Sequence, residues 1–109
     1  MLVRIDLAPH PPVVSLEEPD DTGRFHVTVR GGARGVDEAI VFGALVDAAA
    51  GRLDGDDAWI TVDAVRRLAA GRVGPSWDDE LSRMVEYARS KGWLDERTHA
   101  IRAHVEWSS

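Results

Sequence analysis

Alternating apolar and polar positions predict strands at both ends of the chain. Residues 2–7 alternate apolar and charged side chains, which is the two-residue period of a half-buried strand. Residues 13–16 form an apolar run and 25–29 are apolar on one side, and the Pro, Asp and Gly residues between them favour a chain reversal. We therefore expect an N-terminal β-hairpin or small sheet within residues 1–30.

Three helices are predicted in the middle of the chain. The first covers residues 36–50, ends at Gly51 and contains an unbroken uncharged stretch, so it should lie centrally in the core. The second covers 62–70 with Thr61 as its N-cap. The third follows a capping residue, Ser76, and its apolar residues fall at helical spacing: Leu81, Met84, Val85 and Ala88.

The segments around these helices complete an α+β fold class. Residues 53–57 are rich in Asp and Gly and are expected to form an exposed loop, and 58–60 a short extended piece. Residues 100–107 alternate regularly and should pair with Trp93–Leu94 as a C-terminal β-hairpin. A length of 109 residues suits one domain (1–109) with an N-terminal hairpin, three helices and this final hairpin.

This order of elements resembles the winged helix-turn-helix superfamily over residues 36–107. The stretch Tyr87–Glu96, with the sequence YARSKGWLDE, is similar to the junction at which a recognition helix meets the wing in that superfamily. The resemblance implies a three-helix winged-helix core. It also implies binding of either DNA or another protein.

Charge argues against DNA as the partner. In DNA-binding members the first turn of the third helix approaches the bases, and here that turn carries three carboxylates after Trp77. The chain has a formal net charge of −6. A winged-helix transcriptional regulator remains an alternative if a homodimer gathers basic residues on one face: Arg66, Arg67, Arg72, Arg83, Arg89 and Arg102.

No sequence pattern predicts a catalytic site, a metal site or a cofactor. The absence of Cys removes thiolate chemistry, and the four His show no metal-binding spacing. The acidic turn 54–57 lacks the spacing of a calcium loop. The glycine-rich segment 31–35 matches no phosphate-binding motif, and no Ser lies in a nucleophile elbow. We therefore expect a protein that is not an enzyme.

The remaining expectation is a cytoplasmic interaction module that binds a protein or peptide and no membrane. Contact would lie at the edge of the N-terminal sheet or between the third helix and the wing. Trp is enriched in binding hot spots, so two loop-flanking Trp and four other predicted surface residues are the candidates. They are Trp59, Trp77, Arg83, Tyr87, Arg102 and His104.

A second resemblance concerns the N-terminal hairpin. Together with the helices that follow, it is similar in order and size to peptide-recognition elements of ribosomal-peptide maturation systems. That resemblance implies that a leader peptide adds a strand to the small sheet.

Overall fold

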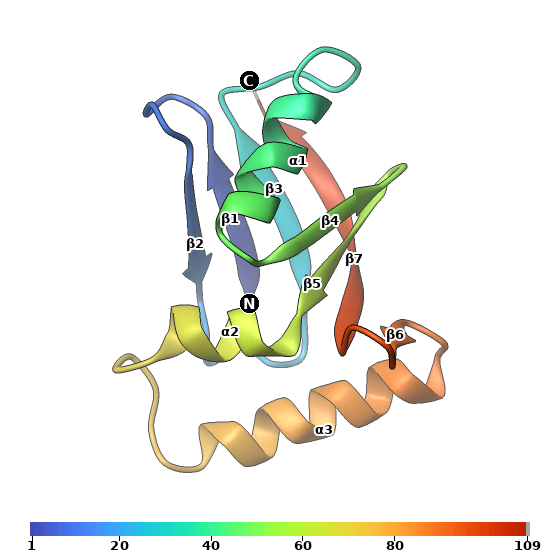
Figure 1. Ribbon diagram of the computed structural model, residues 1–109. Helices are drawn as coiled ribbons and strands as arrows, with labels where there is room; N and C mark the ends of the chain where they lie inside the picture. The colour runs from blue at the N-terminus through green and yellow to red at the C-terminus, as the bar shows by residue number, and fades with distance from the viewer. Residues whose placement is uncertain (109) are drawn as a thin grey trace.

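A computed structural model describes residues 1–108, which form seven strands in one curled mixed sheet and three helices (Figure 1). The strands are β1 (Leu2–Asp6), β2 (Val13–Glu17), β3 (His26–Arg30), β4 (Gly51–Asp54), β5 (Asp57–Thr61), β6 (Leu94–Asp95) and β7 (Ala100–Ser108). The helices are α1 (Glu38–Asp47), α2 (Val62–Ala69) and α3 (Trp77–Ser90). The α+β class agrees with the sequence, whereas the arrangement of the elements does not.

Strand β7 lies at the centre of the sheet. The strand order is β2-β1-β3-β7-β5-β4, and β6 also pairs with β7. β7 runs parallel to β3 and antiparallel to β5 and β6. Its alternation is the one that the sequence predicts, with Ile101, Ala103 and Val105 buried and the residues between them exposed.

The predicted N-terminal hairpin between 13–16 and 25–29 is wrong. Both segments are strands, but β1 lies between them, antiparallel to β2 and parallel to β3. The apolar run in 13–16 and the alternation in 25–29 each indicate a strand, but they carry no information about which strand becomes its neighbour.

The expected three-helix winged-helix core is also wrong. The main contacts of each helix are with strands: α1 with β4 and β2, α2 with β2 and β5, and α3 with β6. Figure 1 shows α1 in front of the sheet between β2 and β4, while α3 lies along the bottom. A core in which helices pack on one another does not form, because a large sheet supplies the apolar surface that each helix covers.

The C-terminal hairpin is present only as the two-residue pairing of β6 with β7. The longer partner of β7 on its other side is β5, which forms a hairpin with β4. β4 was missed because residues 51–54 contain a single large apolar residue, Leu53, beside Gly and charged residues. The expected loop at 53–57 is therefore reduced to the tight turn at Gly55 and Asp56.

The helix ends show which capping predictions hold. Thr61 accepts a hydrogen bond from the Ala64 backbone N–H at 3.1 Å, so the predicted cap of α2 is confirmed. Ser76 makes no side-chain capping bond. α1 ends before Gly51, because Ala49 takes the left-handed conformation at φ 51° and the Ala50 N–H donates to the Leu45 carbonyl at 2.8 Å.

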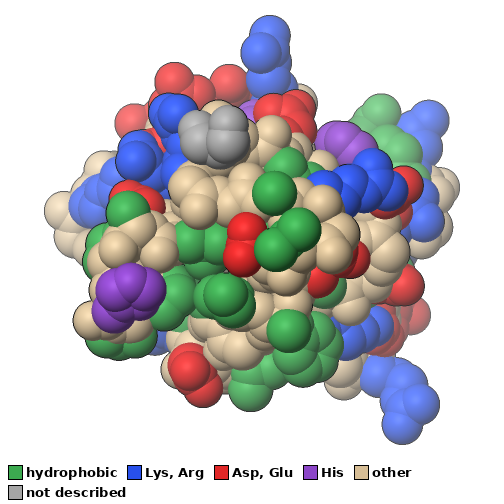
Figure 2. Space-filling view, turned by 90° about the horizontal axis from the view of Figure 1, so that it is seen from above, with side chains coloured by type: hydrophobic (Ala, Val, Ile, Leu, Met, Phe, Trp, Pro, Cys, Tyr) green, Lys and Arg blue, Asp and Glu red, His purple; other side chains and the backbone are tan. Residues whose placement is uncertain are grey.

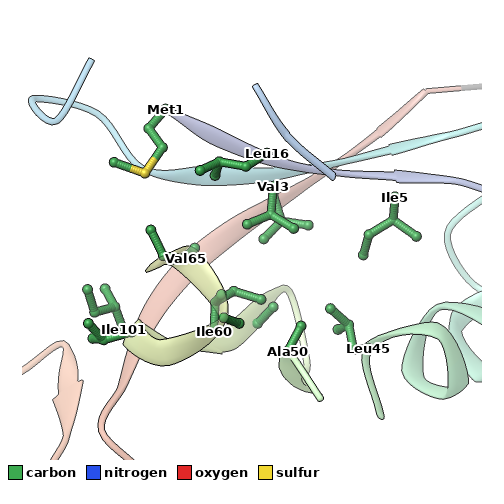
Figure 3. Packing of buried hydrophobic residues seen from close by; sticks show 14 of the residues in the cluster. Met1, Val3, Ile5, Leu16, Leu45, Ala50, Ile60, Val65 and Ile101 are labelled. Atoms are coloured by element: carbon green, nitrogen blue, oxygen red, sulfur yellow. The ribbon is translucent and has the colours of Figure 1, made fainter. Parts of the chain in front are cut away.

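The core lies between the concave side of the sheet and the helices that cover it. Figure 3 shows Val3 and Ile5 of β1 facing Ile60 of β5 and Leu45 of α1 across this space. All four side chains are fully buried. No buried side chain in residues 1–108 is polar or charged, so the interior depends on apolar packing.

Replacing Gly51 by Ala should destabilise the protein by at least about 2 kcal/mol, because Gly51 has a φ of 152° and an added Cβ would overlap the Trp59 carbonyl oxygen. Chemical unfolding of the purified variant measures this loss. Gly74→Ala is the matched control, since nothing lies within 4 Å of a Cβ there and its φ is not in the left-handed region. Equal stability of the two variants would show that β4 does not pair with β5 as described.

Candidate functional site

The six residues predicted to contact a partner lie in three different environments. Arg83 and Tyr87 are in α3 and border a groove. Trp59, Arg102 and His104 lie on the outer face of the sheet, since their strands alternate and the residues between them are buried. Trp77 is in the core. The prediction therefore combined residues that the fold does not bring together.

Trp77 does not belong to an exposed patch. It is 5% exposed, and its indole Nε1 donates a hydrogen bond of 2.6 Å to the Pro19 carbonyl. A buried indole N–H needs such a partner, and here the bond ties the start of α3 to the connection between β2 and β3. Trp77 consequently positions α3 and cannot contact a partner.

Polar contacts on the outer sheet face join Trp59, Arg102 and His104 to acidic side chains. The Trp59 Nε1 donates to an Asp54 carboxylate oxygen at 3.0 Å, and the Arg52 guanidinium lies 5.4 Å from the centre of the Trp59 ring. Arg102 and His104 both lie within 4.0 Å of Asp57. The Trp59 indole N–H is therefore satisfied, whereas Arg102 and His104 make only weak surface contacts with Asp57.

A groove of about 560 Å³ lies between α3, the approach to β3 and the segment before β6. This volume is within the range of sites that hold small ligands or peptide side chains. We call it the α3 groove. Its lining residues are Thr22, Gly23, Arg24, Phe25, Glu80, Arg83, Met84, Tyr87, Trp93 and Ile101.

The sheet produces this groove because β3 and β6 lie on the same side of β7 without meeting. β3 pairs with Val105–Ser108 and β6 with Ala100 and Ile101. Phe25 precedes β3 and Trp93 precedes β6, so both rings border the space between the two strands. α3 crosses this end of the sheet and supplies the remaining wall.

The side chains of the groove are aromatic and partly exposed. Tyr87 is 57% exposed and Trp93 is 36% exposed, and their rings meet edge to face at a centroid distance of 6.0 Å. The Lys91 Nζ lies 5.6 Å from the centre of the Tyr87 ring. Exposed aromatic rings in a concave surface are typical of binding hot spots.

Two arginines of the α3 groove lack an acidic partner. Within the described residues, Arg24 and Arg83 have no carboxylate oxygen within 4.0 Å, although Glu80 lines the same groove. Six of the twelve arginines do pair with acids within the described residues, in a chain with a net charge of −6. The groove therefore presents positive charge beside its apolar wall.

The sequence identified only the α3 side of this groove. Arg83 and Tyr87 are four residues apart and share a helix face, which the helical period alone makes clear. Arg24, Phe25 and Trp93 were not among the candidates. They reach the groove through the pairing of β3 and β6 with β7, which no local pattern reveals.

Asp95 holds the Trp93 side of the groove in place. One of its carboxylate oxygens accepts a bond from the Thr98 hydroxyl at 3.0 Å and lies 3.3 Å from the Arg52 Nη2, while the other accepts the Arg97 backbone N–H at 3.0 Å. These donors favour the charged carboxylate, so the pKa of Asp95 lies below its ordinary value, chiefly because of the Thr98 hydroxyl. The turn between β6 and β7 is thereby fixed relative to β4.

The described residues contain neither a metal cluster nor a spanning helix. In residues 1–108, no three His, Asp or Glu side chains come together in a way that would hold a metal ion. No helix within that range has the length and apolar character needed to cross a bilayer. Every buried side-chain nitrogen or oxygen there has a hydrogen-bond partner.

Comparison with known proteins gives no family. The chain matches no protein-family model, no curated protein and no solved structure.

Replacing Thr98 by Val should raise the pKa of Asp95, because the Thr98 hydroxyl contributes most to lowering it. A folded-state pKa below the unfolded value means that Asp95 stabilises the fold above that value and loses this effect as the pH falls. Thr98→Val should therefore be less stable than the unmodified protein at neutral pH. The difference should shrink as the pH falls below the ordinary Asp value of 3.8.

NMR titration of the Asp95 carboxyl group and chemical unfolding at several pH values measure the two effects. Thr98→Ser is the matched control, since it keeps the hydroxyl and should leave the Asp95 pKa nearly unchanged. An Asp95 pKa that is the same in Thr98→Val and Thr98→Ser would contradict the assigned hydrogen bond.

Proposed function

We propose that the protein is a non-enzymatic interaction module that binds a segment of a partner protein in the α3 groove. The observation that carries this proposal is the combination of exposed Tyr87 and Trp93 with two arginines that have no acidic partner in the described chain. An apolar wall gives affinity, and unpaired charges select the partner.

The chemistry of the groove favours a partner segment that carries an apolar anchor beside Asp or Glu. The anchor would pack between Met84, Tyr87 and Trp93, and its neighbouring carboxylate would reach Arg24 or Arg83. Glu80 would repel a carboxylate at its own end of the groove. This asymmetry would set the direction in which the segment lies.

The groove is a better candidate than strand addition at the sheet edge. β2 is an edge strand, as a leader-peptide site would require. However, the Arg72 Nη1 already donates a 2.6 Å hydrogen bond to the Leu16 carbonyl of that strand. An added strand that paired with that carbonyl would have to displace this bond, whereas binding in the α3 groove displaces no protein contact of Arg24 or Arg83.

DNA binding is not favoured by any contact of α3. Its first turn holds Asp78, Asp79 and Glu80, and Asp78 already pairs with Arg66 at 3.0 Å. The charge of Arg66 is therefore already neutralised by Asp78 and is less available to a DNA phosphate.

Selection from a display library of random peptides on the intact protein should enrich peptides with an aromatic or aliphatic residue next to Asp or Glu. Tyr87→Ala should weaken their binding by about tenfold or more, because Tyr87 is a central exposed ring. The double variant Arg24→Ala, Arg83→Ala should reduce the salt dependence of binding. Fluorescence anisotropy of a labelled peptide measures both.

Phe42→Ala is the matched control, since Phe42 is an aromatic side chain of similar exposure that lies on α1, outside the α3 groove. Equal loss of binding in Phe42→Ala and Tyr87→Ala would contradict the proposed location. A low-salt gel shift that Arg83→Ala abolishes would instead favour the regulator alternative.

A further inference from the structure

Exposed large apolar side chains that lie outside the α3 groove concentrate on α1. Ile40, Phe42 and Val46 of this helix are 50%, 46% and 53% exposed. The inward side of α1 is also apolar, since Val41, Ala44 and Leu45 are buried. A helix that is apolar on all sides is normally covered on all sides, whereas here Ile40, Phe42 and Val46 are exposed, and Ile40 lines a groove.

A second groove runs along this helix. It has a volume of about 370 Å³ and lies between α1 and the Pro11–Pro12 segment that leads into β2. Its α1 wall includes Ala39, Ile40 and Gly43. Figure 2 shows hydrophobic side chains gathered on the upper face of the molecule, with acidic and basic side chains around them. We call this the α1 groove.

Gly43 has no role in the fold that requires a glycine. An added Cβ would meet nothing within 4 Å, and the backbone is not in the left-handed region. A glycine within a helix is less favourable than alanine by about 0.5–1 kcal/mol. The missing side chain instead leaves room for another molecule to approach the helix backbone closely.

Among the described residues that line the α1 groove, the charged one is Asp47, and at that end the Arg67 Nη2 donates a hydrogen bond to the Ala48 carbonyl. In residues 1–108 no basic nitrogen lies within 4.0 Å of the Asp47 carboxylate. α1 carries Glu38 at its other end and contains no Lys, Arg or His. A second copy would bring the same acids, and an anionic lipid surface would be repelled.

We propose that the α1 groove binds a second partner segment, one that is apolar and carries Lys or Arg. The apolar residues of this segment would pack on Ile40 and against the open backbone at Gly43. Its basic side chain would pair with Asp47. The charge preference is opposite to that of the α3 groove, so the two sites would select different segments.

The test uses the Tyr87→Ala protein as the bait for a display library of random peptides, so that ligands of the α3 groove are removed and the two proposals are examined separately. The enriched peptides should combine apolar residues with one or two Lys or Arg. Gly43→Leu, which fills the groove, should weaken their binding at least tenfold. Asp47→Lys should do the same, and replacing the peptide Lys by Glu should restore binding to that variant.

Two controls separate binding from folding. Asp63→Lys reverses an exposed acid on α2 and should leave binding unchanged. Gly43→Ala should unfold at or above the temperature of the unmodified protein, since its Cβ meets open space.

Several outcomes would overturn the proposal. The first is a failure to enrich apolar peptides with basic residues, and the second is full binding by Gly43→Leu. The third is a concentration-dependent dimer, seen by light scattering, that Gly43→Leu converts to monomer, because the occupant would then be a second copy. The fourth is binding to neutral phosphatidylcholine vesicles that Gly43→Leu abolishes, because the occupant would then be lipid.

Discussion

The pairing of β7 on both sides holds the rest of the structure together. One side of β7 is bound by β5, and the other by β3 and β6, so this strand joins the first part of the chain to the second. Ile101, Ala103 and Val105 place its inner face at the centre of the core. Because β3 and β6 both stop short of each other along β7, the same pairing also opens the α3 groove.

The sequence predicts the helices and strands of this fold better than it predicts which strands pair, for a physical reason. Alternation in residues 100–107 and the cap at Thr61 depend on side chains close in sequence, and both agree with the structure. The parallel pairing of β3 with β7 joins segments far apart in sequence and leaves no local pattern. Gly51 was misinterpreted as the end of a helix because glycine suits both a helix end and a strand at φ 152°.

The candidate site also contains some residues that the sequence could place and others that it could not. The helical period of α3 places Arg83 and Tyr87 on one face, so that part of the groove could be predicted. Trp77 has the composition of a hot spot and lies in the same helix, but its orientation toward Pro19 follows from how α3 meets the sheet. Trp93 and Arg24 could be placed beside α3 only once the strand order was known.

Neither exposed apolar region is explained by folding, and this is the strongest argument that both have a binding role. The interior is complete without them, since every buried side-chain nitrogen or oxygen of the described chain is paired and the core contains only apolar side chains. On the outer sheet face, arginines and acids neutralise one another around Trp59. In the α3 groove, Arg24 and Arg83 have no acidic partner in the described chain and outnumber Glu80, and in the α1 groove Asp47 has no basic partner there. In an isolated protein, exposed apolar surface is unfavourable in water, whereas an exposed charge is hydrated. A partner of complementary charge would cover the apolar surface and pair with the charge at the same time.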